Sequence, residues 1–230
     1  MGGINVKITM IQRLLQIVAP DLCYFCGKIG YPFCSYCKYD ITHESVSVCF
    51  WCDKPDIRGV CSRHMQYIEG VSIGAWYEDG VKAALEALKF KNDRFCANAL
   101  AELIHMRLPY LPADTVIVPV PTLARNVRSR GYDQALLLAK AVGRLQQLPV
   151  RRYIQRVRKY TQHDTQSRQQ REAQVRDTFR VHFPTGVLVP QTVLIIDDII
   201  TTGATVQEIA RVLKDSGVQR VFVGAVAHPR

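Results

Sequence analysis

Two adjacent carboxylates, Asp197 and Asp198, come shortly before a polar turn, and the stretch has the chemistry of a ligand site. Carboxylates can accept hydrogen bonds from the hydroxyl groups of a sugar. The turn at residues 201–205 adds threonine hydroxyls and the backbone N–H groups of a predicted helix N-terminus, where a phosphate is stabilised. Gly203 would let the backbone approach such a ligand closely. The stretch predicts a site for a phosphorylated sugar, although a generic α/β turn with a capped helix would share its pattern.

The residues around this turn predict the elements that hold it. Residues 193–196 are apolar and mostly β-branched, which is typical of a strand buried on both faces in a parallel sheet. After Gly203 the apolar residues recur at helical spacing as far as Leu213, and Gly217 stands where a helix would end. Ligands of open α/β sheets bind beyond the carboxyl ends of strands. The order strand, turn, helix therefore places the two acids at such an end.

Four ligand pairs with two-residue spacing predict a second kind of chemistry. They are Cys23 with Cys26, Cys34 with Cys37, Cys49 with Cys52, and Cys61 with His64. This spacing lets both members of a pair reach one ion from a tight turn, and two pairs complete a closed, structural Zn²⁺ site. The simplest arrangement of two zinc ions joins the pairs sequentially, while a crossed pairing stays open. Free structural cysteines are the other interpretation, and the isolated Cys96 is expected to be a buried small hydrophobe.

The positive charge of the chain is concentrated in one segment. The formal net charge is +10, yet residues 1–122 carry 12 basic and 12 acidic side chains, and residues 181–230 carry 4 of each. Residues 123–180 carry 14 basic and 4 acidic side chains. Such a block favours polyanionic partners, either a pyrophosphate or a nucleic acid. The alternative is a solvated helical hairpin whose arginines serve solubility.

The remaining pattern predicts an alternation of strands and helices. Helices are expected at residues 4–18, 81–90, 95–108 and 135–145, and strands at residues 68–77, 115–121 and 221–226. Residues 151–180 are polar and arginine-rich, as in a mobile hairpin or lid. A loop with Arg128 and Arg130 follows the strand at residues 115–121, and arginine suits a pyrophosphate because its planar fork donates two hydrogen bonds.

No apolar run approaches the ~18 residues of a membrane span, and no signal-peptide core is present, so we expect a soluble cytoplasmic protein.

Together these features resemble the ComF family, in which a zinc-binding module precedes a type I phosphoribosyltransferase domain. Residues 197–205 are similar to the motif that binds phosphoribosyl pyrophosphate (PRPP), and residues 118–121 with 128–134 are similar to the family's pyrophosphate loop. Residues 76–78, 88–90 and 171–179 extend the resemblance over nearly the whole chain. The chain departs from the family pattern at Asp133, Gln174, Gln166 and His64.

The resemblance implies an α/β fold with a central, mostly parallel sheet and flanking helices. It implies three parts: an amphipathic helix (1–20), a double zinc-ribbon module (21–67) and a phosphoribosyltransferase domain (68–230). The implied catalytic residues are Asp197, Asp198, Arg128 and Arg130. The implied ligand-binding residues are Asp197, Asp198, Thr201, Thr202, Gly203, Ala204, Thr205, Val120 and Pro121, with Mg²⁺ accompanying PRPP.

The family is implied in natural transformation, where it would handle incoming single-stranded DNA on the cytoplasmic side. Two functions stay open. An enzyme would transfer the phosphoribosyl group of PRPP to an acceptor that the sequence does not identify. A non-catalytic adaptor would bind PRPP as an effector, while residues 123–180 bind single-stranded DNA; DNA-uptake or recombination proteins would then be partners. A nucleobase salvage enzyme is a third and weaker alternative.

Overall fold

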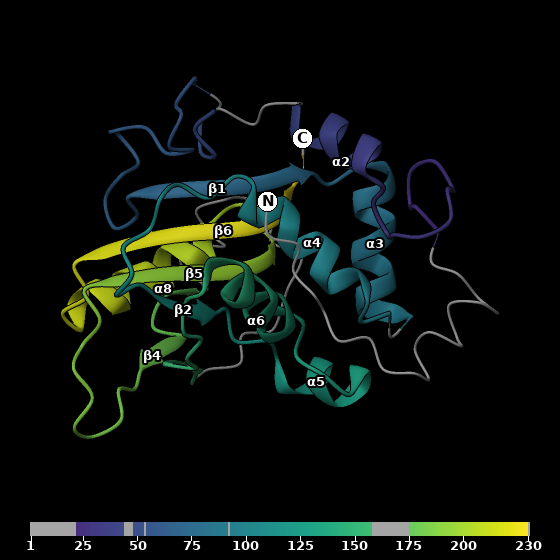
Figure 1. Cartoon of the computed structure of the whole chain (residues 1–230). Coiled ribbons are helices and arrows are strands. Elements are labelled where there is room, and N and C mark those ends of the chain that lie inside the picture. The colour runs from purple at the N-terminus through teal and green to yellow at the C-terminus, as the bar shows by residue number, and fades with distance from the viewer. Residues whose placement is uncertain (1–21, 44–47, 53, 92, 158–174, 230) are drawn as a thin grey trace.

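The computed structural model describes residues 22–43, 48–52, 54–91, 93–157 and 175–229 (Figure 1). The expected helix at residues 4–18 lies outside these ranges, and so do Gln166 and Gln174.

A four-stranded parallel sheet forms the centre of the fold, with the strand order β1-β6-β5-β2 (Figure 1). Its strands are β1 (Gly70–Trp76), β2 (Val116–Pro119), β5 (Thr192–Ile199) and β6 (Arg220–His228). The side chains of residues 193–196 in β5 are fully buried, as expected for a central strand covered on both faces. Because the strands are parallel, the carboxyl ends of β2, β5 and β6 meet at one edge of the sheet.

Helices cover both faces of the sheet and complete two hydrophobic cores. Leu194 and Ile196 face the core that includes residues of α3 (Asp79–Phe90), α4 (Cys96–His105) and α6 (Gln134–Gln146). Val193 and Ile195 face the opposite core, which is completed by α8 (Ala204–Asp215). This alternation along β5 follows from the two-residue period of a strand.

The segment that follows β2 differs from the expectation of an arginine-rich loop. It forms a short helix, α5 (Ala124–Arg130), none of whose residues is buried. Gly131 ends the helix with φ of 77°, in the left-handed region where a glycine meets no steric penalty. The helix therefore holds its arginines on the surface.

The basic segment at residues 151–180 is anchored more firmly than a surface lid would be. Its ends form the antiparallel pair of β3 (Ile154–Arg156) and β4 (Phe179–Val181). Ile154, Val175 and Phe179 are buried in the α8-side core, so the expectation that this segment contributes no core element is wrong at its base. The apolar residues interspersed among the arginines supply that contact, and residues 158–174 lie outside the described ranges.

The cysteine-rich part packs against both faces of the sheet rather than around a core of its own. We call residues 22–43, which include α2 (Ser35–His43), the first ribbon, and residues 48–67 the second ribbon. Phe33 of the first ribbon is buried in the core of α3, α4 and α6. Phe50 and Val60 of the second ribbon are buried in the core of α8. The two ribbons thus contribute to opposite cores.

None of the helices in the described part of the chain is long and apolar enough to cross a membrane.

Phe33→Ala should destabilise the whole fold, although the residue lies in the first ribbon. Its side chain is only 2% exposed, so truncation leaves a cavity in the main core and costs about 3–5 kcal/mol of unfolding free energy in urea titrations. Tyr31→Ala is the matched control, because Tyr31 is 70% exposed and should change stability by less than ~0.5 kcal/mol. Equal stability of the two variants would show that the first ribbon is not part of the core.

Candidate functional site

Asp197 and Asp198 lie at the carboxyl end of β5, and both side chains are half-buried. The backbone N–H of Asp198 donates to Asp197 Oδ1 over 2.8 Å, and the N–H of Ile199 donates to Asp198 Oδ1 over 2.7 Å. These bonds fix both carboxylates at the edge of the sheet, as expected from the sequence.

A cavity of about 240 Å³, which we call the acid cavity, opens beside the two carboxylates. Its wall combines the carboxyl ends of β5 and β2 with residues of α3, α5, α6, α8 and β3. The lining residues are Lys89, Val120, Pro121, Thr122, Leu123, Asn126, Gln134, Ala135, Arg156, Asp197, Asp198 and Thr205. The predicted residues Val120 and Pro121 therefore share one cavity with the two acids.

Lys89 supplies the positive charge nearest to the acids. Its Nζ lies 2.7 Å from Asp198 Oδ2, and both side chains are less than 20% exposed, at 17% and 18%. Burial raises the pKa of Asp197 well above its ordinary value, and the adjacent Asp198 raises it further, while Lys89 acts in the opposite direction. Two carboxylates held this close out of water favour a bound cation or a hydrogen-bond donor, which would stabilise their charged forms.

The polar turn after β5 encloses a second, smaller space of about 50 Å³, which we call the turn cavity. It is lined by Asp197 and by residues 199–206, so all five predicted turn residues border it. Helix α8 begins at Ala204, and its first three residues line this cavity. The acid cavity and the turn cavity share Asp197 and Thr205, so one ligand can extend from the carboxylates to the helix N-terminus.

Gly203 has a structural role in addition to the close approach expected from the sequence. Its φ is 76°, in the left-handed region. A Cβ at this position would lie 2.7 Å from the ring of Phe50 and 2.9 Å from the ring of Trp51. The second ribbon therefore packs directly on the turn, a contact that the sequence did not reveal.

The departure of Asp133 from the family pattern has a local explanation. Asp133 Oδ1 accepts hydrogen bonds from Thr122 Oγ1 over 2.8 Å and from the N–H of Leu136 over 3.2 Å, so it caps α6. Only an acceptor oxygen is needed for this cap, and Asp and Asn both provide one.

The structure does not place the predicted catalytic arginines on the acid cavity. Arg128 is exposed on α5. Arg130 donates to Gln134 Oε1 over 2.6 Å, and its guanidinium lies 5.4 Å from the ring centre of Phe90. Their catalytic roles stay predictions. The cations that do line the cavity are Lys89 and Arg156.

Sequence reasoning missed both of these cations. Lys89 lies within residues 88–90, which carry part of the family resemblance, but no role at the site was predicted for it; Arg156 is one of 14 basic residues in its segment. Both reach the cavity through tertiary packing, which the local pattern does not encode.

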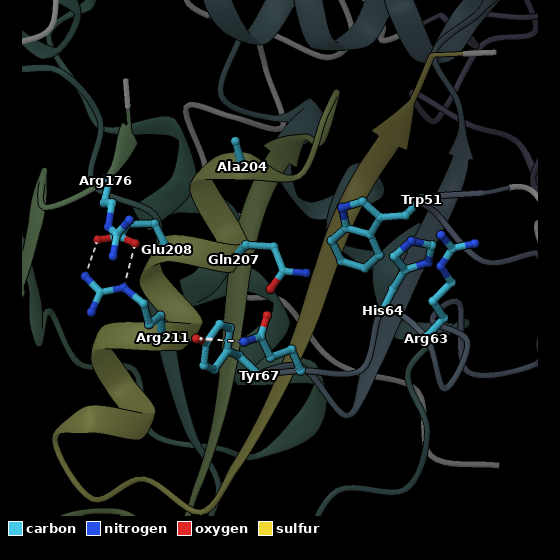
Figure 2. Close-up of a pocket in the computed structure, with 10 residues that line it drawn as sticks. Trp51, Arg63, His64, Tyr67, Arg176, Ala204, Gln207, Glu208 and Arg211 are labelled. Atoms are coloured by element: carbon cyan, nitrogen blue, oxygen red, sulfur yellow. Dashed lines mark hydrogen bonds and ion pairs between the residues drawn. The ribbon is translucent and has the colours of Figure 1, made fainter. Parts of the chain in front are cut away.

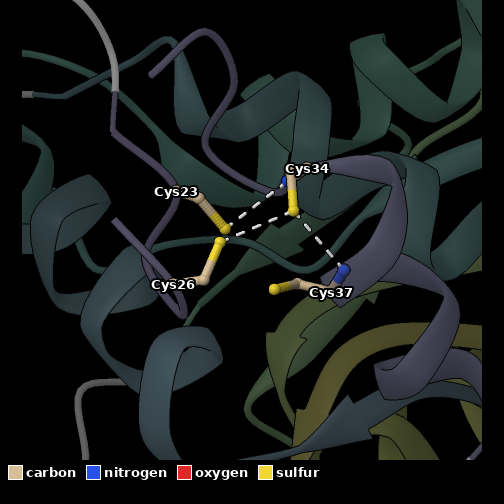
Figure 3. A group of neighbouring side chains, drawn as sticks. All are labelled: Cys23, Cys26, Cys34 and Cys37. Atoms are coloured by element: carbon tan, nitrogen blue, oxygen red, sulfur yellow. Dashed lines mark hydrogen bonds between the residues drawn. The ribbon is translucent and has the colours of Figure 1, made fainter. Parts of the chain in front are cut away.

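The eight predicted metal ligands gather in two groups, joined sequentially (Figure 3 shows the first). The groups are Cys23, Cys26, Cys34, Cys37 and Cys49, Cys52, Cys61, His64, and the ligand atoms of each lie within 4.8 Å of one another. The Sγ atoms of Cys26 and Cys34 are 3.7 Å apart, and those of Cys52 and Cys61 are 3.8 Å apart. A tetrahedral ion with Zn–S bonds of ~2.3 Å requires S···S edges of about 3.8 Å. Both groups therefore fit a closed tetrahedral metal site.

The thiols of the first group differ in how readily they ionise. Burial opposes ionisation of Cys23, but backbone N–H groups of Cys26, Cys34 and Phe25 lower its pKa to about 6. Burial and the neighbouring thiols raise the pKa of Cys37. A bound cation would keep all four sulfurs as thiolates. Cys96 belongs to neither group and is fully buried, as expected.

The purified chain should contain two zinc ions, and each should be removable separately. Cys26→Ser and His64→Ala should each lower the metal content from two to one, because the two groups share no ligand. Cys96→Ser is the control and should retain both ions. Elemental analysis of the folded proteins measures the result, and metal content unaffected by Cys26→Ser would contradict the assignment.

Comparison with known proteins identifies the chain's relatives. Residues 132–229 match the phosphoribosyl transferase domain family. The chain is 25% identical to competence protein F of Haemophilus influenzae over 237 residues, which cover 99% of both chains. It is 30% identical to the DNA utilization protein YhgH of Salmonella typhi over 226 residues, covering 90% of this chain and 97% of that protein. Competence protein ComFC of Streptococcus pneumoniae is 25% identical over 228 residues, which cover 95% of this chain and 94% of that protein.

Among solved structures, the glutamine PRPP amidotransferase of B. subtilis overlaps 62% of this chain and 30% of its own, with a TM-score of 0.42 and 20% identity. The relatives match nearly the whole chain, and the domain match covers its C-terminal part. The chain therefore belongs to the family of competence protein F, ComFC and YhgH, with a type I phosphoribosyltransferase domain behind an N-terminal pair of potential metal sites.

Proposed function

We propose that the chain binds PRPP with Mg²⁺ at the carboxyl edge of β5 and β2 and transfers its phosphoribosyl group during the handling of single-stranded DNA. The observation that carries this proposal is the half-buried carboxylate pair of Asp197 and Asp198, whose cavity continues to the N-terminus of α8. One end of this space offers carboxylates that accept hydrogen bonds from sugar hydroxyls, and the other offers N–H donors for a phosphate.

The ligand would divide among three sets of residues. The ribose hydroxyls would bind Asp197 and Asp198, and the 5′-phosphate would bind the N–H groups and hydroxyls of residues 201–205. The diphosphate would lie in the acid cavity near Lys89 and Arg156, both of which line it. In the free protein Lys89 pairs with Asp198 over 2.7 Å, so ligand binding would exchange this partner for a phosphoryl oxygen.

The donor set of the acid cavity fits Mg²⁺. Carboxylate oxygens are the protein ligands that this ion prefers, and Asp197 and Asp198 present a pair of them beside open space. Bound there, the ion would neutralise charge on the diphosphate and ribose oxygens.

In the proposed transfer, a nucleophile of the acceptor forms a bond to the anomeric carbon of the ribose. The bond from that carbon to the pyrophosphate oxygen breaks, and its electron pair leaves with the pyrophosphate. The acceptor's proton passes to solvent. Lys89 and Arg156 would offset the charge that develops on the leaving group.

The DNA role is supported by the names of the relatives and by the placement of charge. Two of these relatives are a competence protein and a DNA utilization protein. Arg125, Arg128, Arg151 and Arg152 are exposed within the basic segment, where they can contact phosphates without disturbing the core. Binding that depends on phosphate contacts should weaken steeply with added salt. We place this activity in the cytoplasm, in the company of DNA-uptake or recombination proteins.

A non-catalytic adaptor is the second candidate, and one observation favours it. Neither Arg128 nor Arg130 lines the acid cavity, so the two arginines predicted to assist pyrophosphate departure lie elsewhere. In that case PRPP would be an effector that changes DNA binding without being consumed.

Lys89→Met should weaken PRPP binding about tenfold or more, because a charge-assisted hydrogen bond contributes roughly 1.5–3 kcal/mol. Lys91→Met is the matched control: Lys91 is exposed two residues further on and does not line the acid cavity. Titration calorimetry with PRPP and Mg²⁺ measures both affinities. If the two variants lose affinity equally, Lys89 has no specific role in the site.

Pyrophosphate release separates the enzyme from the adaptor. The chain is incubated with PRPP and Mg²⁺, with and without single-stranded DNA, and the masses of candidate acceptors are followed for an added ribose 5-phosphate. Release that depends on an acceptor supports phosphoribosyl transfer. Tight PRPP binding without release supports the adaptor, and the absence of PRPP binding overturns both.

A further inference from the structure

A third cavity, larger than the acid cavity and the turn cavity, opens between the second ribbon and α8 (Figure 2). It measures about 560 Å³ and lies on the face of the sheet that α8 covers. We call it the ribbon cavity. Its volume falls within the ~300–1,000 Å³ typical of pockets that enclose small ligands.

Two walls of different chemistry face each other across the ribbon cavity. The second ribbon contributes Trp51, Arg63 and Tyr67, and α8 contributes Gln207 and the Glu208–Arg211 pair (Figure 2). This arrangement combines flat apolar surface with cationic and amide groups.

Arginine is the commonest charged residue in the lining of the cavity. Three arginines and one glutamate line it. Arg211 is paired with Glu208 over 2.6 Å, and also with Asp177 over 3.2 Å and Asp215 over 2.8 Å, so its charge is fully matched by carboxylates. Arg63 and Arg176 remain as the surplus charge, one on the second ribbon and one just before β4.

Gln207 lines this space and carries an acceptor within its wall. Its Oε1 atom is buried and has no hydrogen-bond partner in the described part of the chain. An acceptor left without a donor out of water costs roughly 1–3 kcal/mol, which a ligand N–H group would recover. Figure 2 shows the side chain extending from α8 toward the space beside Trp51.

These groups point to one class of ligand. An aromatic ring suits the flat face of a nucleobase, an amide oxygen accepts from a ring or amino N–H, and arginines bind the flanking phosphates. An acidic peptide would use the arginines, and its backbone N–H groups could donate to Gln207, but its carboxylate side chains offer no flat ring to the aromatic wall.

We propose that the ribbon cavity takes a nucleobase of single-stranded DNA, which packs against Trp51 and donates a hydrogen bond to Gln207 Oε1, with Arg63 and Arg176 on the neighbouring phosphates. This deepens the proposed DNA role and rests on it. Trp51 also lies against Gly203 in the turn, so the side chain that would stack on the DNA base also borders the turn proposed to hold the 5′-phosphate.

The test compares two labelled single strands of equal length by fluorescence anisotropy. One carries all its bases, and the other carries abasic tetrahydrofuran units, so that only the phosphates are shared. Wild-type protein should bind the base-containing strand about tenfold more tightly or better, as expected for stacking and hydrogen bonding of one base. Equal affinity for the two strands would overturn the proposal.

Variants locate the preference. Gln207→Leu removes the acceptor without touching a metal ligand, and it should reduce the preference for the base-containing strand several-fold while leaving abasic binding unchanged. Gln219→Leu, at an exposed position before β6, is the matched control and should retain the full preference. Trp51→Ala should abolish the preference, with metal content measured to verify that the ribbon is intact.

The double variant Arg63→Ala, Arg176→Ala should bind both strands more weakly by the same factor, because the two strands share the phosphate contacts. A preference that survives Gln207→Leu and Trp51→Ala would place base recognition elsewhere and overturn the assignment of this cavity. PRPP titration of the same variants separates this proposal from the proposed function. A variant that loses the preference for the base-containing strand but binds PRPP normally is altered in the ribbon cavity alone. If the wild-type protein binds neither strand, the DNA role itself is rejected.

Discussion

The burial of two adjacent carboxylates at the end of a central strand is the constraint on which the rest of the structure depends. Asp197 and Asp198 are held by backbone N–H groups and are partly removed from water, so their negative charges repel each other at a site where solvent screens them poorly. In the free protein, the ammonium group of Lys89 neutralises the charge of Asp198. A magnesium ion and the hydroxyl groups of a sugar would stabilise both carboxylates. The neighbouring cavities offer space for the rest of a phosphorylated sugar.

The second ribbon connects this site to the metal-binding part of the chain. Phe50 and Trp51 lie in sequence between two of the metal ligands, Cys49 and Cys52, and they pack against Gly203 in the turn. The left-handed backbone at Gly203 and the contact with the two rings both exclude a larger residue. The metal site of the second ribbon would therefore do more than fold a peripheral module: it would hold one wall of the turn and one wall of the ribbon cavity.

Local patterns predicted the parts of the fold whose signals lie within one segment. The apolar run of β5, the helical period of α8 and the spacing of the eight metal ligands each depend on neighbours in sequence, and the structure contains all three. The identity of the cations at the site was not accessible in this way, because Lys89 and Arg156 come from elements separated from Asp197 by long stretches of chain. Two elements were missed because their arginines suggested loops. The segment of α5 is a helix that ends at Gly131, and the base of the β3–β4 pair is buried through tertiary packing.

Calorimetric titration of PRPP with Mg²⁺ tests the central claim most directly. The double variant Asp197→Asn, Asp198→Asn preserves the shape and the hydrogen-bonding oxygens of both side chains but removes their charge. The account predicts saturable binding to the wild type and none to the double variant, with circular dichroism used to verify that the variant is folded. Equal binding to the two proteins would contradict it.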